Sequence, residues 1–158
     1  MSEFSVRQAT VADVEEVVEL RALMFSAMGV PGVADPGWRA AAAEWLGREL
    51  GGAHVRVVLA ESREGRVVAG AMGTLRFETP SPTNPNGVRG LISNVATQPE
   101  ARRQGLARDC VVGVLHWLRD DTAATVVELF ATGEGTGLYE DLGFTRTAWP
   151  AMRLHLPR

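Results

Sequence analysis

Residues 91–109 read Leu-Ile-Ser-Asn-Val-Ala-Thr-Gln-Pro-Glu-Ala-Arg-Arg-Gln-Gly-Leu-Ala-Arg-Asp, and this stretch decides the fold. Its first part, Leu91 to Thr97, has the length and the β-branched content of a strand, and Gln98-Pro99-Glu100 ends that strand. The arginines and the glycine that follow lead into the apolar run from Cys110 to Leu118, which has the pattern of a helix. The sequence therefore predicts a strand, a short loop and a helix with a basic start.

A helix that starts in this way suits a bound anion. The first backbone N–H groups of a helix have no partner within it, and the helix dipole places partial positive charge there, so phosphate fits at that end. Gly105 lets the backbone approach a ligand closely, and Ala107 keeps the next turn small. Arg102, Arg103 and Arg108 add charge that can pair with phosphate oxygens. Taken alone, the same pattern also fits an ordinary solvated helix start, so its context decides.

Two motifs supply that context. Residues 102–107 resemble the R/Q-x-x-G-x-G/A signature of the GCN5-related N-acetyltransferases (GNAT), the loop that binds the pyrophosphate of acetyl-CoA in that family. Residues 94–99 resemble the family's central strand, and residues 138–144, Leu-Tyr-Glu-Asp-Leu-Gly-Phe, resemble its downstream L-Y-E-x-L-G-F box. The resemblance covers the whole chain in length and element order, and residues 91–144 carry its diagnostic residues.

The resemblance implies an α/β (α+β) fold with a mixed, mostly antiparallel sheet that is flanked by helices and splayed between its two central parallel strands. Besides the central strand, the hydrophobic pattern predicts strands at Phe4–Arg7, Val55–Ser62, Val67–Phe77 and Thr125–Thr132, and one or two closing strands within Thr145–Leu156. It predicts one helix that follows a capping box formed by Thr10 and Asp13 and stops at Gly29. It predicts a second helix from Trp38 to Leu50.

Two details of the predicted strands are left open. Gly70 and Gly73, inside one strand, indicate either a bulge or a close approach of another group to the backbone. Pro80, Pro82 and Pro85 predict a loop over Glu78–Gly90, which is either a cover for the acceptor site or a mobile hairpin tip.

Composition bounds the remaining choices. The chain has 158 residues, of which 46% are hydrophobic, so we expect one domain over residues 1–158. Its net charge is −3, so we expect no nucleic-acid partner. There is no charged-then-apolar leader and no run near the roughly 20 apolar residues of a membrane span, so a cytoplasmic location without membrane contact is expected. The only cysteine, Cys110, lies in a helical apolar pattern and is expected to be a buried structural thiol. His54, His116 and His155 have no ligand spacing, so no metal is expected.

The resemblance also assigns the residues that bind acetyl-CoA. In the family the pantetheine arm pairs with the free edge of the splayed strand. N–H groups two residues apart in a strand point to the same edge, so Val95 and Thr97 are expected to bind the pantetheine arm, with Ala96 between them. Thr132 stands where many members have an asparagine, and its hydroxyl can still bond the pantetheine. The expected acetyl-CoA-binding residues are Val95, Ala96, Thr97, Arg102, Arg103, Gln104, Gly105, Leu106, Ala107, Arg108 and Thr132.

Tyr139 is the expected catalytic residue. It is the only tyrosine, and it occupies the position of the family's tyrosine that protonates the leaving thiolate. The general base is left open among Glu61, Glu78 and Asn94, acting directly or through water. Glu128 is expected to lie about 13 Å along the strand from Thr132, which is too far.

The resemblance implies an acetyl-CoA-dependent N-acetyltransferase that acts on a primary amine of a small molecule or peptide by direct attack on the thioester. The alternative is a non-catalytic acyl-CoA-binding sensor or interaction module, and the presence of Tyr139 favours the enzyme. A phosphate-loop hydrolase is excluded because the chain has no lysine. The acceptor amine stays open, and so does a homodimer, which is common in the family.

Overall fold

The computed structural model describes residues 2–158 and is built on a five-stranded sheet with the order β1-β2-β3-β4-β5. The strands are β1 (Phe4–Gln8), β2 (Val55–Ser62), β3 (Val67–Phe77), β4 (Val88–Thr97) and β5 (Val126–Leu129). The first four run antiparallel to their neighbours, and β5 runs parallel to β4. The mixed, mostly antiparallel sheet expected from the sequence is thus confirmed.

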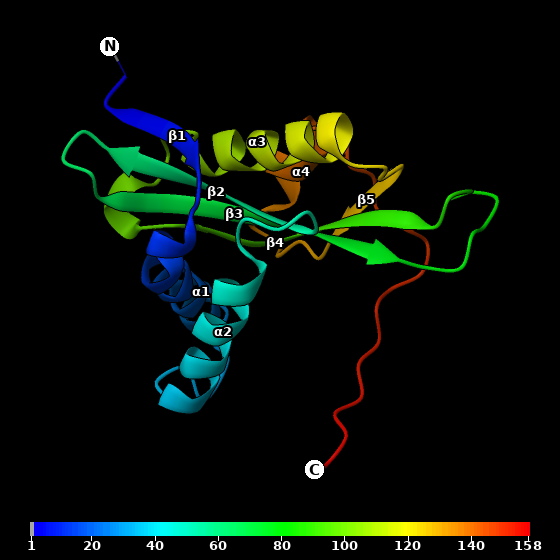
Figure 1. Cartoon of the computed structure of the whole chain (residues 1–158), viewed down its shortest axis with the longest axis horizontal. Helices are drawn as coiled ribbons and strands as arrows, with labels where there is room; N and C mark the ends of the chain where they lie inside the picture. Colours follow the sequence, from blue (N-terminus) through cyan, green and yellow to red (C-terminus); the bar gives the residue numbers. More distant parts are fainter. Residues whose placement is uncertain (1) are drawn as a thin grey trace.

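Helices cover both faces of this sheet (Figure 1). They are α1 (Val14–Ala27) and α2 (Pro36–Glu49) on one face, and α3 (Leu106–Asp121) and α4 (Thr136–Asp141) on the other, with short 3-10 turns at Val11–Asp13 and Pro99–Ala101. The expected capping box forms before α1, because the Thr10 hydroxyl accepts from an N–H in the next turn and the Asp13 carboxylate accepts from the Thr10 N–H at 2.8 Å. Within residues 2–158, no helix has both the length and the apolar character that a membrane span requires.

The glycines of β3 let the layers pack closely. A Cβ atom on Gly73 would lie 2.5 Å from Cγ1 of Val114, so α3 lies directly against the backbone of β3. Near Gly70 the pairing of β3 with β4 shifts by one residue, so that Asn94 and Val95 together face Ala71. Both structural alternatives for these glycines therefore occur. Gly73 marks a close approach of α3 to the backbone, and Gly70 lies beside a β-bulge.

The sheet splits between β4 and β5. The two strands pair only from Arg89 with Val126 to Ile92 with Leu129, whereas β4 stays paired with β3 as far as Thr97. The bulge lies just past the split, and Asn94 there has a left-handed φ of 54°. The predicted splay between the two central parallel strands is therefore confirmed.

The structure corrects three strand predictions. Residues 145–156 form no strand, and this part of the chain extends away from the sheet (Figure 1). A strand needs a partner for its N–H and C=O groups, and within residues 2–158 this segment forms no backbone hydrogen bond with another segment. β5 ends at Leu129 instead of Thr132, because the chain leaves the sheet there. β4 begins at Val88 instead of Leu91, since no proline follows Pro85 to interrupt its pairing with Phe77.

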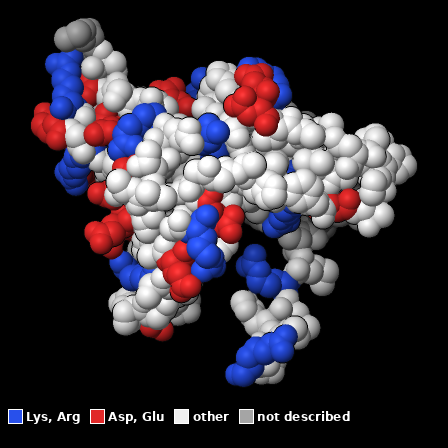
Figure 2. Space-filling view, in the orientation of Figure 1, with Lys and Arg blue, Asp and Glu red and all other residues white. Residues whose placement is uncertain are grey.

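The loop between β3 and β4 therefore spans only residues 78–87. Its Asn84 is buried, and the amide oxygen of Asn84 accepts from the Thr125 hydroxyl at 2.8 Å. Backbone bonds between Ser81 and Asn84 close the turn. The loop projects from the end of the sheet opposite the start of α3 (Figure 1), and the part of the molecule that it forms is largely free of charged side chains (Figure 2).

Candidate functional site

The loop between β4 and α3 is shaped by two residues with left-handed backbone. Arg103 has φ of 63° and Gly105 has φ of 76°, and Gly105 opens α3 without any side-chain cap. No atom lies within 4 Å of the point where a Gly105 Cβ would be, so the surface is open at this residue. The Nε of Arg102 donates to the Thr97 carbonyl at 3.3 Å and ties the loop to the end of β4.

This loop presents a row of free backbone donors. The first intrahelical bond of α3 is donated by the Asp109 N–H to the Gly105 carbonyl at 3.0 Å. The six N–H groups of residues 103–108 before it have no acceptor in the described part of the chain. The exposed side chains of Arg103 and Arg108 form no ion pair within residues 2–158. Free amides, a helix start and unpaired guanidinium groups are the donors that bind phosphate groups.

The open edge of β4 lies beside this loop. The Gln98 N–H donates to the Val68 carbonyl of β3 at 2.7 Å, so by strand alternation the Thr97 N–H points away from β3. Val95 lies two residues earlier and presents its N–H to the same edge. In the described residues, β5 no longer pairs with β4 at this level. The structure thus brings Val95, Ala96 and Thr97 to the split between the strands.

Tyr139 lies in α4, on the same face of the sheet as α3. Its ring packs edge-on against Phe144 with 5.9 Å between ring centroids, and both rings contact the apolar layer that includes Leu106, the first residue of α3. A Cβ on Gly135 would lie 3.1 Å from Cε2 of Tyr139 and 3.6 Å from the hydroxyl of Thr132, so these two side chains are neighbours.

The hydroxyl of Tyr139 is available as a proton donor. It forms no hydrogen bond with any residue from 2 to 158, and burial of the ring raises the pKa of the phenol above its usual value. The phenol therefore keeps its proton at neutral pH. Thr132 is exposed, and its carbonyl accepts from the N–H of Gly135 and the hydroxyl of Thr136.

The comparison with known families gives these features a common meaning. A model of the acetyltransferase (GNAT) family matches residues 16–144, which is most of the chain and contains both motifs. The chain belongs to the acetyltransferase (GNAT) family. This membership confirms the resemblance seen in the sequence and makes the protein an acyltransferase by family. Among curated proteins, none matches the chain.

Solved GNAT structures share the fold. A GCN5-related N-acetyltransferase from Ralstonia eutropha JMP134 has 22% identity and a TM-score of 0.84, with 96% of this chain and 98% of that one covered. A predicted acetyltransferase from Clostridium acetobutylicum, determined with acetyl-CoA, has 21% identity and a TM-score of 0.83, with 95% and 96% covered. Glucosamine-6-phosphate N-acetyltransferase from Arabidopsis thaliana has 16% identity and a TM-score of 0.72, with 97% and 99% covered. At these identities the likeness shows the fold.

The bulge of this GNAT protein is held by a side chain that the sequence analysis did not single out. Arg21 of α1 donates to the amide oxygen of buried Asn94, and its guanidinium lies 4.7 Å from the centre of the Phe25 ring. Burial lowers the pKa of Arg21. The signal in the sequence was an arginine within the apolar stripe of α1, four residues after Val17 and four before Phe25. Because the Asn94 oxygen is occupied by Arg21, Asn94 is poorly placed to take a proton.

The carboxylates considered as general base are also engaged with arginines. Glu61 pairs with Arg7 at the β1 edge of the sheet. Glu78 pairs with Arg89 at 2.9 Å, and Glu128 contacts the same Arg89 at 3.3 Å. Each of these carboxylates therefore contacts an arginine, and the structure singles out none of them as the base.

Cys110 is completely buried in the α3 layer, and burial raises the pKa of its thiol to about 12. The expectation of a structural thiol is confirmed, because so high a pKa leaves almost no nucleophilic thiolate at neutral pH. Within residues 2–158, the side chains of His, Cys, Asp and Glu form no group of three that could hold a metal ion.

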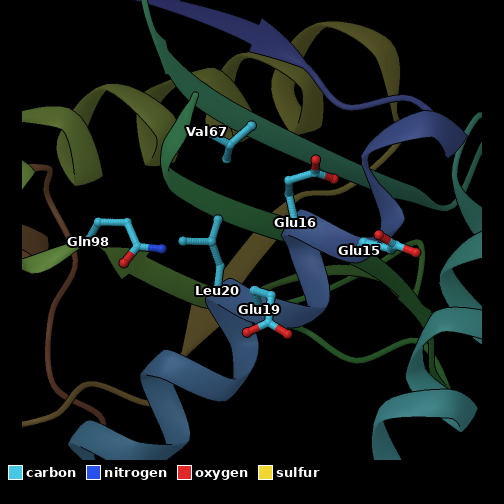
Figure 3. Close-up of a pocket in the computed structure, with 6 residues that line it drawn as sticks. All are labelled: Glu15, Glu16, Glu19, Leu20, Val67 and Gln98. Carbon is cyan, nitrogen blue, oxygen red and sulfur yellow. The ribbon is translucent and has the colours of Figure 1, made fainter. Parts of the chain in front are cut away.

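A groove lies on the α1 face, beside the end of β4 (Figure 3). This groove of about 210 Å³ is lined by Glu15, Glu16, Glu19, Leu20, Val67 and Gln98. Glu19 also pairs with Arg39 at 2.6 Å. Three carboxylates at this groove repel phosphate groups, so the groove is not suited to bind an anion.

Proposed function

We propose that this GNAT protein is an acetyl-CoA-dependent N-acetyltransferase that transfers an acetyl group to a primary amine of a small molecule or peptide. The observation that carries the proposal is the row of free N–H groups over residues 103–108, next to the open edge of β4. The family and the structural neighbour determined with acetyl-CoA support the same cosubstrate. Acetyl-CoA supplies an activated thioester, and the residues of the chain bind it and handle the protons.

Three segments of the chain hold acetyl-CoA in this proposal. The amides of residues 103–108 bind the pyrophosphate, with Arg103 and Arg108 adding charge at the rim. The N–H groups of Val95 and Thr97 pair with the pantetheine arm in the manner of an added strand. The Thr132 hydroxyl, which is exposed beyond β5, supplies a further bond.

Tyr139 acts as the general acid. The amine nitrogen attacks the acetyl carbon, the new C–N bond forms and the C–S bond breaks, and the Tyr139 hydroxyl donates its proton to the leaving sulfur. The attacking amine loses a proton to solvent, the Tyr139 phenolate takes one up from solvent, and we assign no side chain as the base. The rate should therefore rise with pH until the acceptor amine is neutral, a dependence set by the acceptor and measurable with two amines of different pKa.

Release of free thiol from acetyl-CoA in the presence of a panel of primary amines tests the proposal. At least one amine should give turnover, with the acetylated product identified by mass spectrometry. Binding of acetyl-CoA without thiol release for any amine would support the alternative, a non-catalytic acyl-CoA-binding sensor or interaction module.

The variant Tyr139→Phe tests the role of the acid. It should reduce turnover by about 10²- to 10⁴-fold. The affinity for acetyl-CoA and the thermal stability should stay the same, because the ring packing is kept and the hydroxyl makes no hydrogen bond within residues 2–158. Unchanged turnover would remove Tyr139 from the mechanism.

A further inference from the structure

Arg21 of α1 is a half-buried arginine without an acidic partner in the described part of the chain. Its guanidinium donates to the amide oxygen of Asn94 and lies 4.7 Å from the centre of the Phe25 ring. Glu19, the nearest carboxylate along α1, pairs instead with Arg39 of α2 at 2.6 Å. Within residues 2–158, the charge of Arg21 is therefore not balanced by an ion pair.

These surroundings offset the charge of Arg21 only in part. Burial makes a cation less stable, and it lowers the pKa of Arg21 for that reason. The Asn94 amide is neutral, and the face of the Phe25 ring attracts a cation only weakly. A guanidinium has five N–H donors in a planar fork, and the structure shows one hydrogen bond from this one. The remaining donors match the two oxygens of a carboxylate, which would also balance the charge.

Arg21 lies beside the split in the sheet, on the face opposite Tyr139. β4 and β5 stop pairing after Ile92 and Leu129, and Asn94 lies two residues further along β4. The helices α3 and α4 cover one face of the sheet, and α1 and α2 lie on the other (Figure 1). In the proposed function the thioester lies in this split and the proton donor lies on the α4 side. The acceptor amine then approaches from the α1 side, where Arg21 is.

We propose that Arg21 is a specificity-determining residue that binds a carboxylate of the acceptor, an inference that rests on the proposed function. The acceptor is then a primary amine that also carries a carboxylate group, as amino acids do. One guanidinium suits the single charge of a carboxylate better than the double charge of a phosphate monoester, because the charge of Arg39 is already paired with Glu19. Phe25 also packs edge-on against Trp38 with 5.8 Å between ring centroids, so an apolar side chain of the acceptor would meet an aromatic surface beside the carboxylate.

Amines that differ only in the carboxylate test this assignment in pairs: L-phenylalanine with phenethylamine, L-leucine with isoamylamine, and β-alanine with ethylamine. Release of free thiol from acetyl-CoA gives kcat/KM for each amine, and the ratio within a pair measures the preference for the carboxylate. In at least one pair the wild type should prefer the carboxylate member by about tenfold or more, because hydrogen bonds between charged groups are strong. Equal values, or a preference for the plain amine, in every pair would overturn the assignment, while acetyl transfer itself would stand.

Substitutions at Arg21 separate its effect from the basicity of the amines. Arg21→Met removes the charge and keeps an unbranched apolar side chain, whereas Arg21→Lys keeps a charge that can still donate to Asn94. The ratio within a pair should fall by about tenfold or more in Arg21→Met and be partly kept in Arg21→Lys, and the pKa of each amine cancels in this comparison. Arg39→Met is the matched control and should leave the ratio unchanged, since Arg39 is paired with Glu19. An unchanged ratio in Arg21→Met would overturn the assignment.

A purely structural role of Arg21 would give another result. Loss of the contact with Asn94 would then lower kcat/KM by the same factor for both members of every pair, and such an equal fall would overturn the assignment. If Arg21 binds the carboxylate, the plain amines should keep their kcat/KM in Arg21→Met, and the affinity for acetyl-CoA should stay the same. Circular dichroism checks that the variants are folded.

Acceptor binding without turnover keeps this test separate from the proposed activity. The protein saturated with CoA has no acetyl group to transfer, so calorimetric titration with each pair and with phosphoethanolamine measures binding alone. The carboxylate member of at least one pair should bind about tenfold or more tightly than its plain amine, and should lose this advantage in Arg21→Met. Lack of thiol release with every amine would count against the proposed activity only. Tighter binding of phosphoethanolamine than of every carboxylate, or no binding that depends on the carboxylate, would overturn the carboxylate site.

Discussion

The substitution Gly73→Ala tests how α3, and with it the phosphate-binding loop, is seated on the sheet. The added Cβ would lie 2.5 Å from Val114 Cγ1 and 3.0 Å from Trp117 Cζ3, both in α3. Carbon atoms in contact prefer separations of about 3.5–4.0 Å, so the side chains of Val114 and Trp117, or α3 with them, must shift by about 1 Å. Overpacking of this kind typically costs about 1–3 kcal/mol in free energy of unfolding.

Thermal unfolding followed by circular dichroism measures this cost. For a chain of 158 residues, each kcal/mol shifts the Tm by about 2–4 °C, so a loss near 2 kcal/mol predicts a decrease of about 4–8 °C. Gly47→Ala is the matched control, because it lies in α2 with no atom within 4 Å of the new Cβ. It should be neutral or raise stability by up to about 1 kcal/mol. A Gly73→Ala variant with the Tm of the wild type would refute the packing argument.

The remaining predictions concern the site and the acid stability of the fold. Gly135→Ala places a Cβ 3.1 Å from the Tyr139 ring, so turnover should fall several-fold with little change in acetyl-CoA affinity. Gly137→Ala is the control and should leave turnover unchanged, because its new Cβ meets no atom within 4 Å. Equal kinetics for the two variants would contradict the placement of Tyr139. Arg7 holds the pKa of Asp13 below its ordinary value, so this carboxylate stabilises the fold at neutral pH, and its contribution is lost as the pH falls below about 4. Asp13→Asn should therefore destabilise the protein in urea unfolding at pH 7 and much less at pH 3, and an equal loss at both values would speak against the ion pair.

Local sequence signals predicted the elements whose causes are local. Val55–Ser62 and Val67–Phe77 were predicted with the bounds of β2 and β3, because alternation and turn residues mark both ends. The capping box of Thr10 and Asp13 is likewise a property of four adjacent residues. The loop before α3 was predicted from Gly105 and the arginines around it.

Features that depend on distant partners could not be predicted in the same way. Asn94 was one of three candidate bases, and its amide oxygen accepts a hydrogen bond from Arg21, which lies 73 residues away in the sequence. This contact is seen only in the folded structure. The engagement of Glu61 and Glu78 with arginines is equally a tertiary feature. The closing strands within Thr145–Leu156 were predicted from a valid period-two pattern, but a strand also requires a partner for its backbone groups, and the pattern alone does not supply one.

The central claim is that the loop before α3 binds the pyrophosphate of acetyl-CoA. Calorimetric titrations with acetyl-CoA and with S-acetylpantetheine, which lacks the pyrophosphate, test this claim most directly. If the pyrophosphate binds the free amides of residues 103–108, acetyl-CoA should give saturable heat and bind at least about tenfold more tightly, since each hydrogen bond to a charged group contributes about 1.5–3 kcal/mol. No heat with acetyl-CoA, or equal affinity for the two compounds, would contradict the claim.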